Sequence, residues 1–417
     1  MNIGIVTVWF ESGAGYVSRQ YKNLLEKAGH QVFIFARGGF YPKNDPLYNT
    51  QDIFWSSPSP YPHLTSFNLT EFIKWLRENE IQAVFFNEQT WFKPLEVCRD
   101  LAIKTGLYVD YYTQDSLPYF DAFDFLICNT KRHYEVFQKH PQSYYVPWGT
   151  DTGLFCPRSY DLVVRDELTL FHSCGGDPAR KGTDLLIRAF GEVEGNCKLV
   201  IHTQIHLLHR WKALDSLIHR LLVQGKLQII QKTVGAPGLY HLGDVYAYPT
   251  RLEGIGLTIA EALACGLPAI VPDDQPMNEF VDDSCGKLVK VEKHYGRSDK
   301  YYWPLGEVSI IGLARRIREY ADDLGNMKSH KEKARQHAEA KLNWMNNVKL
   351  INKIFTESTL RNTGRNSSAS LFAYNMYPPR RSSAILYSLS PAVFRISNII
   401  WKKLKNIRLR PLRSRQT

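Results

Sequence analysis

The sequence predicts an α/β protein built from two doubly wound, Rossmann-like domains. Its 417 residues exceed what one ordinary hydrophobic core needs, so two domains of ordinary size plus a further segment are expected. Apolar, β-branched runs alternate with helix-length segments along most of the chain. Two of these runs, Ile3 to Phe10 and Thr169 to Ser173, lead into glycine-rich turns followed by helical patterns. A strand, a glycine turn and a helix in that order are typical of the doubly wound fold.

The first predicted domain covers residues 1–150. An irregular stretch from Tyr41 to Thr65, rich in Pro, Ser and aromatic residues, interrupts its alternation of strands and helices. In order, the predicted elements are strand Ile3 to Phe10, helix Tyr16 to Ala28, strand Val32 to Ala36, helix Leu69 to Glu78, strand Ala83 to Phe86, helix Pro94 to Lys104, strand Leu107 to Tyr112, strand Phe125 to Cys128, helix Lys131 to Lys139 and strand Tyr144 to Val146.

The second predicted domain covers residues 151–340 and repeats the pattern. Its predicted elements are strand Thr169 to Ser173, helix Thr183 to Phe190, strands Leu199 to Ile201, Leu227 to Ile230 and Val245 to Tyr248, helix Thr258 to Cys265, strand Ala269 to Val271 and helix Ile310 to Leu324. A long helical pattern from Lys328 to Thr356 ends the regular part of the chain, and residues 358–417 form a basic tail.

The charge distribution separates this tail from the body of the protein. The net charge is +11, but the residues after Glu357 include twelve Lys or Arg and no Asp or Glu, so residues 1–357 carry a net charge of −1. Nucleic acid is therefore not expected as a partner. The hydrophobic content of 44% and the charged content of 22% are typical of a soluble globular protein.

The cysteines and the first residues favour a reduced compartment. The seven cysteines are odd in number and form no Cys-x-x-Cys pair, which indicates buried thiols rather than a disulfide framework. The chain begins with Asn2 to Val6, without the basic segment of a signal peptide, and no apolar run reaches about eighteen residues. We therefore expect a cytoplasmic protein without a spanning helix.

The glycine turn of the first domain is a poor dinucleotide fingerprint. Gly13 and Gly15 fit the pattern, but Ser18 stands at the place of the third glycine. The second strand is followed by Arg37, where an acid that binds ribose is expected. These departures argue against NAD as a cofactor.

A second glycine turn lies between the predicted strand ending at Tyr248 and the helix that follows. Gly254 and Gly256 have no Cβ, so a ligand can approach the backbone where the N–H groups of the helix point outward. Glu253 and Glu261 flank this turn, eight positions apart. One alternative is structural, because Thr258 and Glu261 also have the spacing of a capping box.

A basic loop opens the second domain. Arg180 and Lys181 precede Gly182 and a predicted helix, so two cations meet the positive end of a helix dipole. This combination favours an anion bound between them. The alternative is a solvated cation pair at a helix start.

These two stretches resemble a known family. Tyr248 to Pro268 resembles the Glu-x7-Glu signature of retaining nucleotide-sugar glycosyltransferases of the GT-B architecture, in particular glycosyltransferase family 4, with Ile255 in place of Phe. Arg180 to Gly182 resembles the family's basic loop, and Pro147 to Pro157 resembles the junction between its domains. The resemblance implies two Rossmann-like domains facing a cleft, with residues 341–357 crossing back onto the first domain.

The resemblance also implies an activity: a hexosyltransferase that moves a sugar from a nucleoside diphosphate donor to a glycan, lipid-linked or other hydroxyl acceptor. Retention of configuration is implied, with no metal and no other cofactor. Lys181 and Arg180 would neutralise the leaving diphosphate, Glu253 would hold the sugar and Glu261 the ribose. The other expected donor contacts are Gly254, Ile255, Gly256, Leu257, Thr258, Gly13 and Gly15.

The sequence departs from the family at two places. An Arg is usual where Gly175 stands, and a His is usual near residues 111–115, where Asp115 is a candidate replacement. These departures leave two alternatives open. One is a GT-B relative such as a nucleotide-sugar epimerase, and the other is an inactive GT-B protein kept for binding or scaffolding.

Two remaining patterns concern metals and membranes. His202, His206 and His209 have helix-like spacing, but His202 ends a strand and no Glu accompanies it, so no metal site is expected. In the tail, residues 390–410 predict a basic amphipathic helix. It would bind an anionic membrane surface peripherally, or pack on the protein itself.

Overall fold

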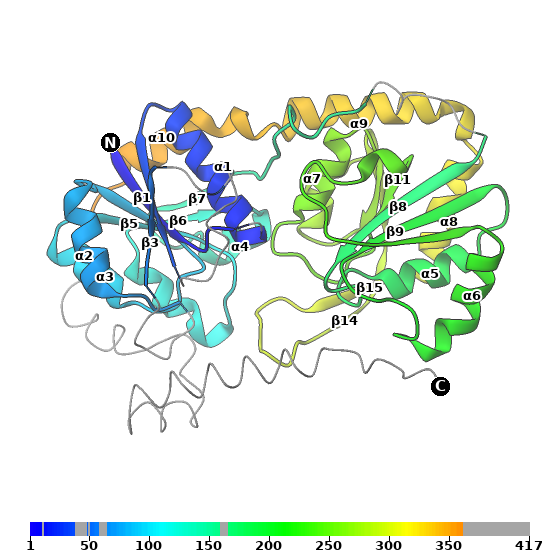
Figure 1. Cartoon of the computed structure of the whole chain (residues 1–417), viewed down its shortest axis with the longest axis horizontal. Coiled ribbons are helices and arrows are strands. Elements are labelled where there is room, and N and C mark those ends of the chain that lie inside the picture. Colours follow the sequence, from blue (N-terminus) through cyan, green and yellow to red (C-terminus); the bar gives the residue numbers. More distant parts are fainter. Residues whose placement is uncertain (11, 38–47, 49–50, 58–64, 159–165, 362–417) are drawn as a thin grey trace, which may run out of the picture.

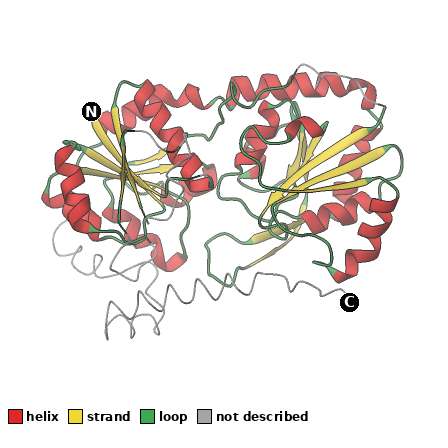
Figure 2. Ribbon diagram, in the orientation of Figure 1, coloured by secondary structure: helices red, strands yellow, loops and turns green. Residues whose placement is uncertain are grey.

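Two parallel β-sheets form the body of the protein (Figure 1). The computed structural model describes residues 1–361 except 11, 38–47, 49–50, 58–64 and 159–165. The sheets have the strand orders β3-β2-β1-β4-β5-β6-β7 and β10-β9-β8-β11-β12-β13. Helices lie on both sides of each sheet (Figure 2), which confirms the predicted class of two Rossmann-like units. The predicted tail helix lies outside the described residues.

The first sheet is formed by residues up to Tyr145. Its strands are β1 (Asn2–Thr7), β2 (Gln31–Ala36), β3 (Ile53–Trp55), β4 (Ala83–Asn87), β5 (Lys104–Tyr108), β6 (Phe125–Cys128) and β7 (Ser143–Tyr145). The helices of this part are α1 (Gly13–Lys27), α2 (Leu69–Glu78), α3 (Lys93–Asp100) and α4 (Lys131–Phe137), with a 3-10 helix at Gln114–Ala122. The stretch predicted to be irregular contributes β3, an edge strand paired with β2.

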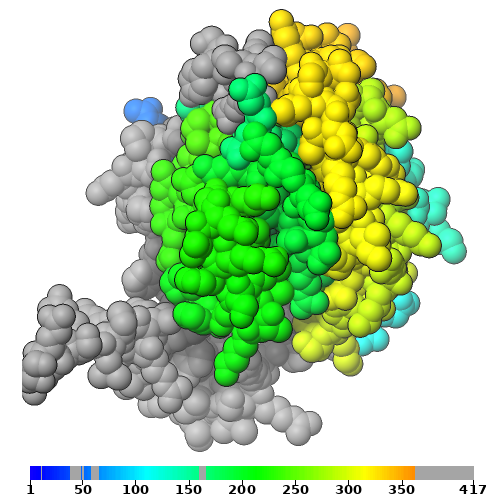
Figure 3. All heavy atoms as spheres, turned by 90° about the vertical axis from the view of Figure 1, so that its right-hand side faces the viewer, coloured from blue at the N-terminus to red at the C-terminus, as the bar shows by residue number. Residues whose placement is uncertain are grey.

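The second sheet is formed by residues 168–289. Its strands are β8 (Leu168–Gly175), β9 (Cys197–Thr203), β10 (Leu227–Gln231), β11 (Val245–Ala247), β12 (Ala269–Pro272) and β13 (Gly286–Val289). The helices are α5 (Thr183–Gly191), α6 (Asp215–Val223), α7 (Leu257–Ala264), α8 (Ile310–Ala321), α9 (Met327–Lys341) and α10 (Val348–Glu357). In a view onto the end of this domain, green segments near residue 220 and yellow segments near residues 310–340 form the outer surface (Figure 3).

The first glycine turn differs from its predicted form. The strand predicted to reach Phe10 ends at Thr7, and α1 begins at Gly13 because the side chain of Ser12 accepts a hydrogen bond from the backbone of Gly15. Both glycines therefore belong to the first turn of the helix. The apolar run suggested a longer strand, but the hydrogen bond of the Ser12 cap starts the helix at Gly13.

The predicted long helix from Lys328 to Thr356 is wrong, because α9 and α10 are separate helices. The break is held by the linker between the sheets, where Thr150 exchanges backbone hydrogen bonds with Leu342 and Trp344 at 2.7 and 3.0 Å. A Cβ on Gly149 would stand 2.5 Å from the Leu342 carbonyl oxygen, so glycine permits this close crossing.

After the break, α10 packs on the first sheet's side of the molecule, against α1 (Figure 1). The Phe355 ring contacts Phe85 and Phe125 edge to face, and the indole N–H of Trp344 donates to the Gln20 carbonyl at 3.0 Å. The C-terminal segment thus ties the two sheets together a second time. None of the helices in the described ranges is long and apolar enough to cross a bilayer.

A β-hairpin that the sequence did not suggest joins the domains on another side. It consists of β14 (Val291–Tyr295) and β15 (Leu305–Val308), and its connecting residues 296–304 reach the first domain. The backbone N–H of Tyr302 donates to the Tyr112 carbonyl at 3.0 Å, and the rings of Tyr111 and Tyr301 stack 4.8 Å apart. We call residues 296–304 the strap.

Candidate active site

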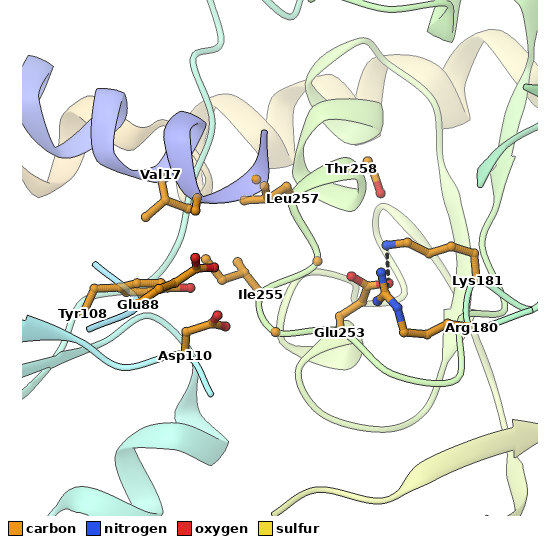
Figure 4. Close-up of a pocket in the computed structure, with 14 residues that line it drawn as sticks. Val17, Glu88, Tyr108, Asp110, Arg180, Lys181, Glu253, Ile255, Leu257 and Thr258 are labelled. Atoms are coloured by element: carbon orange, nitrogen blue, oxygen red, sulfur yellow. Dashed lines mark hydrogen bonds and ion pairs between the residues drawn. The ribbon is translucent and has the colours of Figure 1, made fainter. Parts of the chain in front are cut away.

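A cavity of about 280 Å³ lies between the two domains, where the carboxyl ends of strands from both sheets meet (Figure 4). Its lining residues are Gly13, Ala14, Val17, Glu88, Tyr108 and Asp110 from the first domain and Arg180, Lys181 and Glu253 to Thr258 from the second. A neighbouring cavity of about 380 Å³ shares Gly13, Leu257 and Thr258 with it and is also lined by Glu261. The expected donor contacts therefore line one connected region, with the exception of Gly15.

The basic loop (Arg180 to Gly182) and the second glycine turn (Glu253 to Gly256), which we call the acidic turn, meet directly in this cavity. Lys181 Nζ lies 2.6 Å and Arg180 Nη1 3.3 Å from the same carboxylate oxygen, Oε1 of Glu253. This oxygen also accepts hydrogen bonds from Tyr248 and Thr250, at 2.9 and 2.7 Å. Figure 4 shows both cationic side chains turned toward Glu253. Two stretches that lie about seventy positions apart in the sequence thus form one charged centre.

The electrostatics keep Glu253 ionised. Burial by itself would raise the pKa of its carboxyl group, but the charges of Lys181 and Arg180, with their hydrogen bonds, lower this pKa to about 2. Burial in turn lowers the pKa of Lys181, and the negative charge of Glu253 opposes that effect. The centre is a desolvated cluster in which a carboxylate is held between two cations.

Close packing of the two loops creates this contact. Gly182 has a left-handed backbone (φ +69°), and a Cβ there would stand 1.9 Å from the Pro249 carbonyl oxygen. The backbone N–H of Arg251 donates to the Arg180 carbonyl at 2.7 Å. The Arg251 guanidinium binds Asp184 in α5 at 2.7 and 2.8 Å, which fixes the basic loop from the other side.

Glu261 does not act as a helix cap. The cap position of α7 is Gly256, at φ +100°, and no side chain closes the helix start. The Glu261 carboxylate instead accepts a hydrogen bond from the Tyr240 hydroxyl at 2.5 Å, beside the larger cavity. The capping-box alternative is therefore wrong, because a left-handed glycine takes the cap position and the Glu261 side chain faces Tyr240.

The two glycines of the first glycine turn, Gly13 and Gly15, have different surroundings. Gly13 faces the cavity, and a Cβ there would meet nothing within 4 Å. A Cβ on Gly15 would stand 2.0 Å from the Phe10 carbonyl oxygen, and Gly15 lines neither cavity. Gly15 therefore allows the loop at Phe10 to approach α1 closely. The spacing of the glycines in the sequence does not distinguish this packing role from ligand binding.

Gly175, where the family usually has Arg, ends β8 and lines the larger cavity. Its backbone is left-handed, with φ +54°. That conformation favours glycine over any residue with a Cβ. Arg180 and Lys181 are therefore the cations that the second domain presents to the smaller cavity.

Sequence reasoning missed the acids of the first domain. Glu88 and Asp110 follow β4 and β5 and face Glu253 across the cavity (Figure 4). Burial and the nearby charge of Glu88 raise the pKa of Asp110 to about 7, against the opposing charges of Arg132 and Arg180. Burial also raises the pKa of Glu88. Asp115, the candidate from sequence, is exposed in the 3-10 helix and lines neither cavity.

Sequence reasoning also missed Arg132 and His133, two first-domain residues that form hydrogen bonds with the backbone of the acidic turn. The Arg132 guanidinium donates to the Glu253 carbonyl and, at 2.7 Å, to the Gln275 carbonyl. His133 Nε2 lies 3.2 Å from the Gly254 carbonyl oxygen. Burial and the charge of Arg132 lower the pKa of His133 to about 3, so the imidazole is neutral and donates through Nε2. The backbone of the turn is thus positioned from the opposite domain.

The three histidines with helix-like spacing do not converge. His202 contacts Ser173 and the Lys232 carbonyl, His206 contacts Gln231, and His209 contacts Asp215. Among the described residues, one other group could hold a metal ion: Asp282, Cys285 and His337, whose ligand atoms lie within 4.8 Å of one another. Lys341 binds Asp282 at 2.9 Å, and this group lines neither of the two cavities.

Residues 162–295, which include the basic loop and the acidic turn, match the family model of glycosyl transferases group 1. A curated relative, the GDP-mannose-dependent alpha-(1-6)-phosphatidylinositol monomannoside mannosyltransferase of Mycolicibacterium smegmatis, is 29% identical over 147 residues. That match covers 30% of this chain and 37% of the relative's length.

Solved structures resemble the fold over most of its length. Sucrose-phosphate synthase from Thermosynechococcus elongatus gives a TM-score of 0.65 at 16% identity, with 89% of this chain and 100% of that chain covered. A glycosyltransferase from Rickettsia africae gives 0.66 at 16%, with 86% and 99% covered. HepE of Anabaena, solved in complex with UDP-glucose, gives 0.63 at 15%, with 85% and 99% covered.

The matched segment resembles glycosyl transferases group 1, and the fold of the described residues is that of the GT-B architecture. Within this fold, the second domain carries the group 1 segment, and the charged centre of Lys181, Arg180 and Glu253 lies inside that segment.

Proposed function

We propose that the protein transfers a hexosyl group from a nucleoside diphosphate-sugar to a hydroxyl group of a glycan or lipid-linked acceptor. The observation that carries this proposal is the contact of Lys181 and Arg180 with Glu253 in a cavity between two Rossmann-like domains. A diphosphate needs cations and backbone donors, and a sugar needs a carboxylate that accepts hydrogen bonds from its hydroxyl groups. The cavity offers these groups side by side.

The chemistry follows from the charges. When the bond between the sugar and the diphosphate breaks, negative charge develops on the departing phosphate oxygen. Lys181 and Arg180 stabilise this charge, and the burial of Lys181 reduces its screening by solvent. Glu253 then holds the hydroxyl groups of the sugar, and the backbone of Gly254 to Gly256 lies against the sugar and phosphate. Glu261, in the neighbouring cavity, holds the ribose.

Two relatives support a nucleotide-sugar donor. HepE of Anabaena was solved with UDP-glucose, and the mycobacterial relative is named as dependent on GDP-mannose. Retention of configuration, catalysis without a metal and a cytoplasmic location are parts of the same proposal.

The test is release of nucleoside diphosphate from UDP-glucose, GDP-mannose and related donors, together with thermal-shift binding. We expect Lys181→Met to lower turnover about 10²- to 10³-fold, the size of effect seen when a group stabilising transition-state charge is removed. Lys74→Met is the matched control, because Lys74 is 66% exposed on α2 and does not line the cavity. Donor binding without turnover by the wild-type protein would instead favour an inactive binding protein.

For the basic tail we propose peripheral attachment to an anionic membrane surface through residues 390–410. Co-sedimentation with vesicles of mixed phosphatidylcholine and phosphatidylserine tests this, with a variant ending at residue 361 as the comparison. Equal binding by the two proteins, or binding independent of phosphatidylserine, contradicts the proposal.

A further inference from the structure

Three side chains with metal-binding atoms meet in the second domain, outside the lining of the two cavities. Asp282 and Cys285 belong to the turn before β13, and His337 lies on α9. A carboxylate oxygen, the thiol sulfur and an imidazole nitrogen of these residues lie within 4.8 Å of one another. None of the three residues lines either cavity, so the proposed sugar transfer leaves this group unused.

The turn from Asp282 to Gly286 holds the first two of these residues in place. The backbone N–H groups of Cys285 and Gly286 both donate to the Asp282 carbonyl, at 3.0 Å. The backbone N–H of Asp282 donates to Cys285 Sγ at 3.4 Å, and such a bond stabilises a negatively charged sulfur. Burial raises the pKa of the Cys285 thiol to about 12, so the sulfur keeps its proton until a cation binds to it.

The imidazole of His337 is oriented through its other nitrogen. Nε2 lies 3.1 Å from the Phe280 carbonyl oxygen, which only accepts hydrogen bonds, so Nε2 carries a proton. In the neutral ring, Nδ1 then presents a lone pair to Asp282 Oδ2, 3.5 Å away. Histidines that bind metals usually donate their second ring N–H to a carbonyl or a carboxylate in this way. Two acceptor atoms that face each other at this distance need a cation between them, which is either a proton or a metal ion.

The carboxylate of Asp282 is oriented as well. Ser284 donates to Oδ1 from its backbone N–H at 3.0 Å and from its hydroxyl at 2.5 Å. Oδ2 lies toward His337 and toward Lys341, whose ammonium group is 2.9 Å away. The Lys341 side chain is 62% exposed, so it can move into solvent. The oxygen that faces the imidazole is thus one that binds a cation.

We propose that Asp282, Cys285 and His337 bind a zinc ion. A thiolate, an imidazole and a carboxylate together are typical zinc ligands. Zinc–ligand bonds of about 2.0–2.3 Å place ligand atoms roughly 3.3–3.6 Å apart in a tetrahedral site. The carboxylate and the imidazole have this separation, and the sulfur has to approach by no more than about 1.5 Å. The zinc–sulfur bond forms as the thiol loses its proton to solvent, and Lys341 leaves the carboxylate.

The three residues leave a fourth position on the ion. Asp282 and His337 line a cavity of about 210 Å³, so a water molecule can complete the tetrahedron. α9 runs toward the first domain, and the chain crosses over directly after this helix (Figure 1). The ion ties the C-terminal part of α9 to the turn before β13 and fixes the point from which the chain returns to the first domain. It takes no part in sugar transfer, so this proposal is tested separately from the proposed function.

The test uses the full chain after treatment with EDTA and removal of the chelator, with Zn²⁺ and Co²⁺ as probes. We expect one Zn²⁺ per chain with a dissociation constant of about 10 μM or below, measured by competition with a chromogenic chelator. Co²⁺ in the same site gives the charge-transfer absorption of a cobalt–thiolate bond, which requires a cysteine ligand. Zn²⁺ also raises the Tm, because it binds the folded chain.

Two variants remove ligands. Cys285→Ser abolishes the cobalt–thiolate absorption and weakens zinc binding by at least about tenfold. Its matched control is Cys156→Ser, which retains both properties, because Cys156 is an exposed free cysteine outside the group. Asp282→Asn also weakens zinc binding, and it keeps an acceptor for Ser284 at a half-exposed position, so this variant folds even if Cys285→Ser does not.

Lys341 separates a metal site from a hydrogen-bonded cluster. We expect Lys341→Met to tighten zinc binding about two- to fivefold, because a surface ammonium group no longer competes for Asp282 Oδ2. Lys333→Met, an equal charge change at an exposed position of the same helix, leaves the affinity unchanged.

Several results would overturn the proposal. They are zinc binding weaker than about 10 μM, a cobalt–thiolate absorption that survives in Cys285→Ser, and an unchanged zinc affinity in both ligand variants. Each would mean that a proton, not a metal ion, lies between Asp282 and His337. Equal effects of the two lysine variants would contradict the placement of the ion at Asp282 Oδ2.

Discussion

At the scale of single residues, the charged centre of Lys181, Arg180 and Glu253 is built around one carboxylate oxygen. Glu253 Oε1 is contacted by Lys181, Arg180, Tyr248 and Thr250 within 3.3 Å. The side chain is only 8% exposed, so these charges interact with little screening by solvent. Removing one charged side chain from such a cluster leaves the opposite charges buried and unpaired, which destabilises the folded protein.

This arrangement predicts a specific dependence of stability on pH. The pKa of Glu253 is about 2 in the folded protein, below its ordinary value of 4.5. Its contribution to the free energy of unfolding is therefore fully present above about pH 4.5 and is lost as the pH falls toward 2. We expect Glu253→Gln to be less stable than the wild type by on the order of 3 kcal/mol at pH 7, with a smaller difference at pH 3.

Urea denaturation between pH 3 and pH 7 measures this difference. Glu78→Gln is the control, because Glu78 is 58% exposed and its ion pair with Lys74 is a surface pair. A gap between wild type and Glu253→Gln that stays constant over this pH range would contradict the assignment.

At the scale of secondary-structure elements, the site is made by two loops that pack against each other. The basic loop precedes α5 and the acidic turn precedes α7, and both helices begin at left-handed glycines, Gly182 and Gly256. Gly182 is the tighter of the two, because a Cβ there would overlap the Pro249 carbonyl oxygen. The contact between the loops therefore requires a glycine at this position.

We predict that Gly182→Ala destabilises the protein and displaces Lys181 from Glu253. The left-handed backbone alone costs a residue with a Cβ roughly 1–2 kcal/mol, and the overlap at 1.9 Å adds to this. Gly195→Ala is the matched control: Gly195 is also left-handed, at φ +100°, but a Cβ there meets nothing within 4 Å. Thermal unfolding should show a clearly larger loss of Tm for Gly182→Ala. Equal losses would mean that the loops do not depend on this contact.

The elements that sequence could predict are those with local signals. α2 and β6 have the bounds predicted for them, because an Asn cap or a short apolar run marks each of them. Arg180, Lys181 and Glu253 also carry local signals, since a charged residue beside a glycine turn and a helix start has few structural reasons to be there. The structure brings these three residues into contact.

The acids that line the cavity from the first domain could not be predicted in the same way. Glu88 is a single acid after a strand, and its left-handed backbone depends on Arg37, about fifty positions earlier. Asp110 follows a strand that ends at Tyr108, four residues before the predicted end, so the predicted strand included it as one more alternating residue. The strap between β14 and β15 has no periodicity that distinguishes it from a surface loop. These features depend on tertiary contacts.

At the scale of the whole molecule, the cavity exists only because the two sheets are held in one orientation. The linker at Thr150 lies beside the segment at Trp344, and the two exchange backbone hydrogen bonds. After this segment, α10 packs against α1. On another side, the strap of the second domain contacts Tyr111 and Tyr112 of the first. Two separate connections thus hold the cavity-lining groups of one domain against those of the other.

Within the strap, Trp303 is the residue whose removal best tests this second connection. Its indole N–H donates to the Tyr112 hydroxyl at 2.7 Å, and its ring lies 5.1 Å from the Arg132 guanidinium. Tyr112 in turn contacts His133 Nδ1 at 2.8 Å, and His133 and Arg132 hold the backbone of the acidic turn. The tryptophan therefore supports both residues that position Glu253 and Gly254 from across the cleft.

We predict that Trp303→Ala loosens the strap and raises the KM for the donor, while the two sheets stay folded. Losing one hydrogen bond and one cation–π contact costs on the order of 1–2 kcal/mol, which corresponds to roughly tenfold faster hydrogen exchange in residues 300–304 and 111–113. Trp211→Ala is the control, because Trp211 is a half-buried indole of the second domain that takes no part in the strap. If exchange in both segments is unchanged, or if the control accelerates it equally, the strap does not hold the domains, and the linker and α10 alone set the width of the cleft.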